Sequence, residues 1–320
     1  MPPASRGKLK VTVDGLNVRK SGSIKGAIIG SLNQGDVVDW IGSSKDSNWY
    51  KIKTNGLTGW SSHRFLLPIA APAAPHAYDA IVQMAGNSAI AGYSWKNRGT
   101  APRGYIKGMA LVYARVYCKL KAGDPFALEM AKANTGNAAK DALAWYAQIF
   151  QSVGMSNEAD GVNTLRHLFV LLIGLGMRES SGRYCEGRDR SASNTGADTA
   201  EAGMFQVSFD ARVASPLLPQ LFQQYLPKRT SGFVEVFREG VPCTAKDWEY
   251  FGTGPGRDFQ QLCKECPAFT AEFTAVGLRN IRKHWGPIIN RAAEVRPEAN
   301  LMLTQVEHIV DSANLCPAVT

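Results

Sequence analysis

The residues best suited to chemistry lie in a short segment, Gly174 to Gly182, that contains the pair Glu179-Ser180. An apolar run, 168–173, leads directly into it. Apolar surroundings disfavour the ionised form of a carboxylate and therefore raise its pKa. If the run is helical, Glu179 lies at its C-terminal end, where the helix dipole also disfavours negative charge. Both effects favour a protonated Glu179 near neutral pH, which is the state that a general acid requires.

A carboxylate in this position also has a purely structural interpretation, as a helix cap or as a partner of Arg178 or Arg183. The sequence further along favours chemistry. A block Gly-Met-Phe-Gln occupies 203–206 after a polar loop at 191–202. A third block, Phe-Gly-Thr-Gly-Pro-Gly-Arg, occupies 251–257 and precedes another predicted helix.

In this order the three blocks resemble the lysozyme-like superfamily, specifically goose-type lysozymes and soluble lytic transglycosylases. That family has a Glu-Ser pair, then Gly-Leu-Met-Gln, then Ala-Tyr-Asn-Ala-Gly-Pro-Gly. The match covers roughly residues 165 to 260. The resemblance implies that Glu179 is the catalytic acid. It also implies substrate contacts at four positions of the blocks: Ser180, Gln206, Phe251 and Gly254.

The chain departs from the family pattern at three positions. Phe251 stands where the family has Tyr, so a hydroxyl contact is lost there. Gly252 replaces the Asn, and Ser208 stands where goose-type lysozymes carry an Asp. These departures motivate one alternative, a non-catalytic wall-binding protein that retains an inactive lysozyme-like fold.

A glycosidase needs more than an acid, because a second carboxylate or the substrate itself must complete the reaction. Inverting hydrolases place the second carboxylate roughly 6.5 to 9.5 Å from the acid, which leaves room for a water molecule. The candidates are the loop acids Asp189, Asp198 and Glu201. Asp198 is the first choice, because it lies closest to the Asp of the goose-type pattern, and Glu201 is the second. Each also has an interpretation as a solvated loop carboxylate.

If no loop acid serves, the enzyme is expected to be a lytic transglycosylase. In such enzymes the 6-hydroxyl of the sugar attacks and a 1,6-anhydro product forms. The loop acids therefore decide between hydrolysis and transglycosylation, and the sequence leaves the two open.

The N-terminal region has a different pattern. Residues 8–13 alternate polar and apolar side chains as a strand does. Turn signals at Gly35-Asp36 and Asn55-Gly56 separate further short strands. The predicted strands cover 8–13, 28–32, 36–41, 49–53 and 58–61. Five short strands within 8–68 predict a small all-β barrel.

Four blocks of this region resemble the bacterial SH3-like domain in order and spacing. They are Leu16-Asn17-Val18-Arg19 and the stretches at 29–36, 48–52 and 59–62. The family commonly binds bacterial cell-wall peptides, so the resemblance implies a targeting module. The alternative is a barrel that only packs against its neighbour.

An Ala/Pro-rich linker at 69–78 marks the boundary to a mainly α-helical domain at 79–320. Periodicity predicts helices at 104–120, 125–133, 138–153, 161–177, 216–225, 267–284 and 297–313. Asp124 and Asp160 are expected to cap the second and fourth of these. The predicted fold class is multidomain, with an SH3-like barrel followed by a lysozyme-like domain.

Composition limits the partners. The chain has 320 residues and a net charge of +9, which suggests an acidic polymer such as nucleic acid or an anionic cell wall. The basic residues are scattered and form no nucleic-acid fingerprint. Apolar runs are too short to cross a membrane, and no N-terminal signal peptide is visible. The histidines lack metal-ligand spacing, so we expect neither a metal nor a cofactor.

The six cysteines are expected to be structural, and their pairing stays open. Together these features predict a monomeric muramidase that cleaves the MurNAc-β-1,4-GlcNAc bond of peptidoglycan at an extracellular, cell-wall or periplasmic site. Chitin is a weaker alternative substrate.

Overall fold

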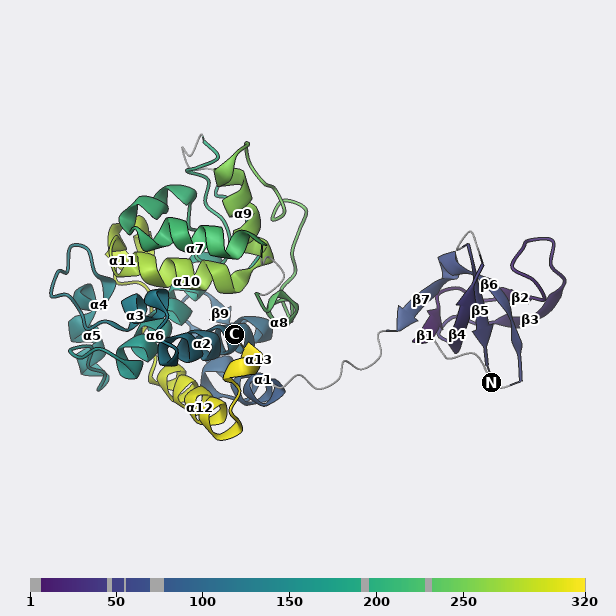
Figure 1. Ribbon diagram of the computed structural model, residues 1–320, viewed down its shortest axis with the longest axis horizontal. Helices are drawn as coiled ribbons and strands as arrows, with labels where there is room; N and C mark the ends of the chain where they lie inside the picture. The colour runs from purple at the N-terminus through teal and green to yellow at the C-terminus, as the bar shows by residue number, and fades with distance from the viewer. Residues whose placement is uncertain are drawn as a thin grey trace. The chain divides into compact units, whose positions relative to one another are not determined.

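The computed structural model describes residues 7–44, 48–54, 56–69, 78–190, 196–227 and 232–319. The chain divides into two compact units, Met1–His76 and Ala77–Thr320 (Figure 1). The predicted linker, 69–78, lies almost entirely outside the described residues. Within the described ranges, no helix combines the length and the apolar content that a membrane crossing requires.

The N-terminal domain is a seven-stranded antiparallel sheet whose order is β3-β2-β6-β5-β4-β1-β7. Its strands are β1 (Gly7–Val11), β2 (Leu16–Arg19), β3 (Ile28–Leu32), β4 (Val37–Ser43), β5 (Trp49–Lys53), β6 (Thr58–Ser62) and β7 (Leu66–Ile69). Alternate residues, among them Leu9, Val18, Val38 and Ile52, form its apolar core. A Cβ at Gly59 would lie 2.5 Å from Val18 Cγ1, so β2 and β6 can meet only at a glycine.

The five predicted strands are present, and the structure adds β2 and β7. Each of the two added strands has four residues. So short a strand shows too little alternation to be recognised by its pattern. β2 coincides with the first block of the SH3-like resemblance, and β7 follows a 3₁₀ turn at His63–Phe65.

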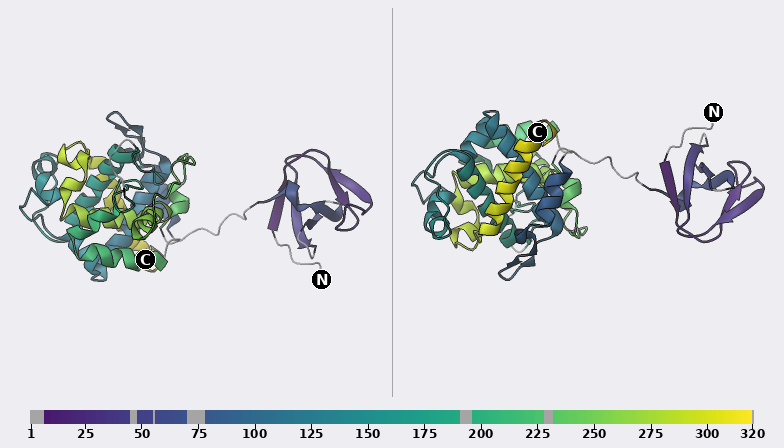
Figure 2. Two further views of the ribbon diagram at one scale, coloured as in Figure 1. Left: turned by 90° about the horizontal axis from the view of Figure 1, so that it is seen from above. Right: turned by 90° about the horizontal axis from the view of Figure 1, so that it is seen from below.

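The second unit, called here the helical domain, is built around α2, α6 and α10. Its elements are α1 (Asp79–Gly86), β8 (Ser94–Trp95), β9 (Gly99–Thr100), α2 (Arg103–Lys121), α3 (Pro125–Ala131), α4 (Ala142–Trp145), α5 (Ala147–Ser152), α6 (Val162–Ser180), α7 (Leu217–Tyr225), α8 (Val234–Phe237), α9 (Pro255–Glu265), α10 (Pro267–Leu278), α11 (Gly286–Ile289), α12 (Pro297–Ala313) and α13 (Cys316–Val319). Every residue of α10 is buried. Figure 2 shows α12 along the outside of the domain, where it packs on α2 and α6.

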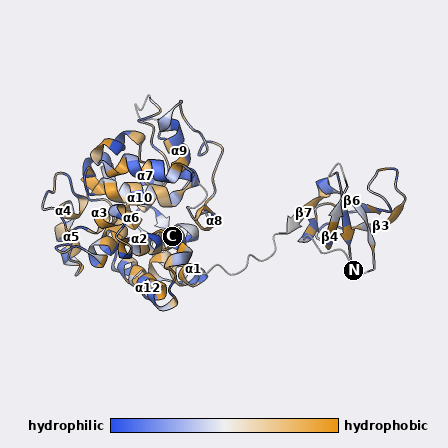
Figure 3. Cartoon of the chain, viewed as in Figure 1, coloured by the Kyte–Doolittle hydropathy of each residue, from blue (hydrophilic) through white to orange (hydrophobic). Residues whose placement is uncertain are grey.

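Hydrophobic residues concentrate on the central helices, and polar residues predominate on α9 at the edge of the domain (Figure 3). α6 is buried along most of its length, including an unbroken run from His167 to Met177. This burial is why its sequence is apolar all round rather than amphipathic. The chemistry of the domain therefore has to lie at the end of α6.

Most predicted helices are confirmed, with three corrections. Asp124 caps α3 as expected and accepts from Phe126 N at 2.9 Å. Asp160 does not cap α6, because its carboxylate accepts from Ala133 N at 2.7 Å. The predicted helix 138–153 divides into α4 and α5 at Tyr146. The predicted helix 267–284 ends at Leu278 and resumes only as a 3₁₀ turn.

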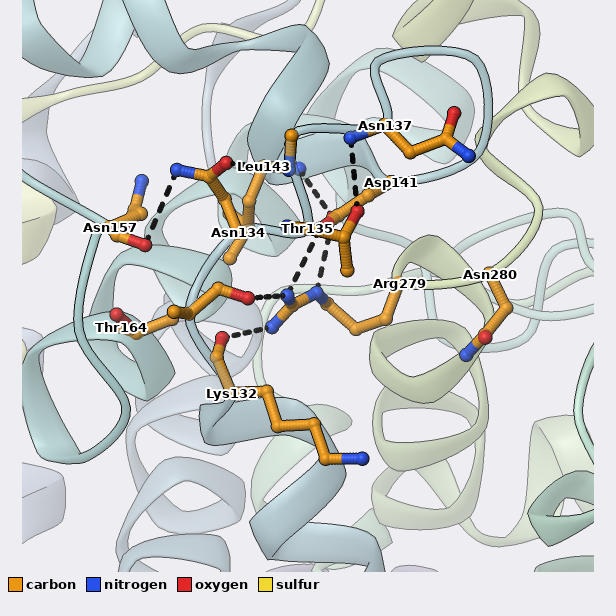
Figure 4. Close-up of polar contacts among 12 residues, drawn as sticks. Lys132, Asn134, Thr135, Asn137, Asp141, Leu143, Asn157, Thr164, Arg279 and Asn280 are labelled. Atoms are coloured by element: carbon orange, nitrogen blue, oxygen red, sulfur yellow. Dashed lines mark hydrogen bonds and ion pairs between the residues drawn. The ribbon is translucent and has the colours of Figure 1, made fainter.

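Just past the end of α10, Arg279 forms a buried ion pair with Asp141 (Figure 4). The guanidinium Nη2 lies 3.0 Å from Asp141 Oδ2, and other N–H groups donate to the carbonyls of Lys132 and Ala133. Asp141 also accepts from Leu143 N at the start of α4. A buried pair is tolerated only when its remaining groups are satisfied, as they are here. The Arg279 side chain therefore joins the end of α10 to the α3–α4 connection.

Two disulfides form among the described residues, Cys118–Cys316 and Cys185–Cys243. Cys263 and Cys266 remain buried thiols. Burial raises the pKa of the Cys266 thiol to about 11, so it stays protonated and unreactive. The C-x-x-C sequence is therefore part of the core.

Candidate active site

The C-terminal end of α6 presents Glu179. The helix ends because Ser181 adopts a left-handed conformation with φ 56°. The N–H groups of Ser181 and Gly182 then close on the carbonyls of Met177 and Gly176. Glu179 precedes this turn and is half-buried. The sequence prediction that a carboxylate ends a buried helix is confirmed.

The second block forms a tight turn beside this helix end, closed by an antiparallel bridge between Ala202 and Val207. Ser180 Oγ donates to Met204 O at 2.9 Å. Trp285 Nε1 donates to Phe205 O at 3.0 Å. The turn is thus fixed from two sides. The indole of Trp285 holds the block that carries the cleft residue Gln206.

The end of α6, the second block and the loop between them enclose a polar cleft of about 410 Å³. Its lining residues are Glu179, Glu186, Gly187, Arg188, Asp189, Arg190, Glu201 and Gln206. The structure therefore brings together Glu179, Glu201 and Gln206, which the sequence had proposed for one site. It also adds Asp189, the candidate that the sequence placed third.

The cleft shifts the pKa of both central carboxyl groups upward. The pKa of Glu179 is raised to about 8, mainly by burial and also by the Glu201 carboxylate, while Arg98 and Arg178 oppose the shift. Burial also raises the pKa of Glu201, and Asp189 adds to that shift. Glu179 consequently holds its proton at pH 7.

Arg98 is a site residue that the sequence analysis missed. It lies in the turn between β8 and β9, and its Nη2 donates to Arg178 O at 2.5 Å. A guanidinium at a helix C-terminus stabilises the exposed carbonyl groups there. The turn signal Asn97 to Gly99 was readable, but nothing in its spacing connects it to Glu179.

The structure places Asp198, the first choice for a second carboxylate, against the start of α9. It is not among the described residues that line the cleft. Its carbonyl accepts from Asp210 N, and its Oδ2 lies 4.0 Å from Arg212 Nη2. A Cβ at Gly256 would lie 2.4 Å from Asp198 Oδ1, so the carboxylate packs against the start of α9. Asp198 is near the Asp of the goose-type pattern in sequence, but its side chain does not line the cleft that contains Glu179.

Three residues expected at the substrate lie outside the cleft lining. Ser180 is buried beneath it and bonds the second block. Phe251 stacks under the Arg188 guanidinium, 4.1 Å from the ring centre. Gly254 is exposed at the start of α9, where its φ of 76° suits glycine. Most of the residues of the three blocks named here therefore support the cleft walls, and only Glu179 and Gln206 line the cleft.

Comparison with known proteins addresses the N-terminal domain. Residues 14–66 match the family model of the bacterial SH3 domain. Bacterial SH3 domains commonly bind cell-wall peptidoglycan, and the match indicates a cell-wall-associated protein. No curated protein matches the chain. The predicted SH3-like domain is confirmed, and the helical domain is mainly α-helical as expected, whereas its lysozyme-like assignment stays a prediction.

Proposed function

We propose that the helical domain is a peptidoglycan-cleaving glycosidase, a muramidase of lysozyme-like fold, and that the bacterial SH3 domain delivers it to the cell wall. One observation carries the proposal. Glu179, whose pKa is raised to about 8, lines the same polar cleft as a second carboxylate, Glu201. Two carboxyl groups in one site, one of them kept protonated by its surroundings, match the acid and base roles of glycoside hydrolysis.

In this mechanism the Glu179 carboxyl group donates its proton to the glycosidic oxygen as the bond to the anomeric carbon breaks. Glu201 accepts a proton from the water molecule that attacks the anomeric carbon. Gln206, the last residue of the second block, lines the same cleft as the catalytic acid and would bond sugar hydroxyl groups there. The charge of Glu201 raises the pKa of Glu179 and so keeps the acid protonated.

A lytic transglycosylase is the second candidate, and the raised pKa of Glu201 supports it. The shift disfavours the ionised form of Glu201, which is the form that could activate water. The 6-hydroxyl of the muramic acid residue then attacks its own anomeric carbon. The Glu179 carboxylate takes the proton that this hydroxyl loses, and a 1,6-anhydro end forms.

Digestion of purified peptidoglycan followed by mass spectrometry tests both candidates. Reducing ends support hydrolysis, and 1,6-anhydro ends support transglycosylation. Glu179→Gln should abolish fragment release while the chain still sediments with cell walls. Glu239→Gln is the matched control, because Glu239 pairs with Lys107 on the surface and should leave the rate unchanged.

Two outcomes would contradict the enzyme proposal. Wall binding without released fragments would indicate a non-catalytic binding protein. Wild-type fragment release by Glu179→Gln would remove Glu179 from the mechanism. Chitin digested in parallel shows whether the activity extends beyond peptidoglycan.

A further inference from the structure

The cleft residue Asp189 stands between two arginines that share one partner. Arg188 Nε lies 3.2 Å from Glu249 Oε2, and Arg190 Nη2 lies 3.2 Å from the same oxygen. The Phe251 ring supports the Arg188 guanidinium from the other side. Because the residues before and after Asp189 are both held by Glu249, the backbone at Asp189 is held as well.

Glu249 belongs to a segment that is itself firmly attached. Lys264 Nζ donates to the carbonyls of Asp247 and Glu249, at 2.5 and 2.8 Å. The Lys264 side chain is buried, and its ammonium group has three N–H donors that need acceptors within the protein. Arg183 Nη2 lies 2.6 Å from Asp247 Oδ2, and the Cys185–Cys243 disulfide links the same two segments, 183–190 and 243–249. The first part of the cleft loop, 183–190, is therefore fastened to the 243–249 segment.

This attachment has an electrostatic effect on the cleft. The acids that line it are Glu179, Glu186, Asp189 and Glu201. The cations near them are Arg98 and Arg178 beside Glu179, Arg183 beside Glu186, and Lys264, Arg188 and Arg190. Arg188 and Arg190 both pair with Glu249, which directs their guanidinium groups away from the catalytic carboxylates.

We propose that Glu249 is a positioning residue, which draws Arg188 and Arg190 to one carboxylate and thereby holds Asp189 beside Glu201 in the cleft. Asp189 acts on Glu201, and Glu201 acts on Glu179, each by like-charge repulsion. Loss of Glu249 frees two cations next to this series. The catalytic acid then loses its proton at lower pH. The inference rests on the proposed function for its activity readout alone.

The test is Glu249→Gln, with the pKa of Glu179 followed by carboxyl ¹³C NMR in glutamate-labelled protein. The Glu179 signal is assigned by its loss in Glu179→Gln. We expect the pKa of Glu179 to fall by about one pH unit, the size typical of a newly approached opposite charge at a partly solvated site. The alkaline limb of kcat for fragment release should move down equally. Glu239→Gln should shift neither quantity.

Two further variants separate positioning from a general loss of structure. The triple variant Glu249→Gln, Arg188→Gln, Arg190→Gln removes the freed cations and should return the pKa of Glu179 toward the wild-type value. Glu249→Asp keeps the charge and should stay close to wild type. An unchanged pKa in Glu249→Gln, or a triple variant that shifts as far as the single one, would overturn the inference. If the wild type releases no fragments, the proposed function fails, but the NMR titration still decides the role of Glu249.

Discussion

Replacing Glu179 by Gln should abolish activity and at the same time stabilise the helical domain, by an amount that depends on pH. The pKa of Glu179 is raised from its ordinary 4.5 to about 8 in the folded chain. Between these two values the folded state holds a proton that the unfolded state has lost. The free energy of unfolding of the wild type therefore falls as pH rises, by up to about 1.4 kcal/mol per pH unit.

The cost to the wild type at pH 7 follows from this slope. Integrated from pH 4.5 to pH 7, this slope lowers the free energy of unfolding by about 3 kcal/mol at most. Glu179 is half-buried, so water screens part of the effect, and about 1 to 2 kcal/mol is the expected size. Gln carries no titrating proton and avoids the cost. The advantage of Glu179→Gln over the wild type should be smallest below pH 4.5 and should stop growing above pH 8.

Urea unfolding measured by far-ultraviolet circular dichroism at several pH values checks this expectation. The α-helices of the described residues all lie in the helical domain, so the helical signal reports on that domain. Taking the difference between variant and wild type cancels the other titrating groups to first order. A difference that stays constant between pH 5 and pH 8 would refute the reasoning, because it would mean that folding does not raise the pKa of Glu179.

Three further outcomes are expected. In Glu201→Gln the pKa of Glu179 should fall, because a like charge is removed, and the pH–rate profile of the residual activity should lose its alkaline side first. Trp285→Phe removes the indole hydrogen bond to Phe205 O and should lower the free energy of unfolding by about 1 to 3 kcal/mol in urea titrations. Deleting residues 1–76 should weaken sedimentation with cell walls but leave kcat on soluble glycan fragments unchanged, and an equal loss of kcat would contradict a purely targeting role.

The parts of the fold that follow from local pattern were predictable. Alternation in the N-terminal domain and the buried run before Glu179 each appear in the structure where the sequence placed them. Prediction failed where a distant partner decides the local conformation. Arg279 pairs with Asp141 just past the end of α10, and Asp160 accepts from Ala133 instead of capping α6. Neither contact leaves a trace in residue spacing.

The same reasoning applies to the candidate site. Glu179 was identifiable because its own neighbours create its environment. The second carboxylate was not, because the choice among the loop acids depends on how the loop folds back. The loop is held by the Cys185–Cys243 disulfide and by Glu249, which lie far along the chain. Arg98 was invisible for that reason too, since it reaches α6 from a hairpin formed much earlier in the sequence.

The other disulfide, Cys118–Cys316, closes a long covalent loop within the helical domain. It joins positions 198 residues apart, and the whole candidate cleft lies within the loop that it closes. On the chain-entropy model, a link across so long a loop lowers the entropy of the unfolded chain enough to stabilise the folded state by about 5 kcal/mol. Typical domains have a total stability of only about 5 to 15 kcal/mol. The stability of the cleft thus depends on the redox conditions around the protein, because reduction of this distant disulfide removes a contribution comparable to the whole stability of a marginal domain.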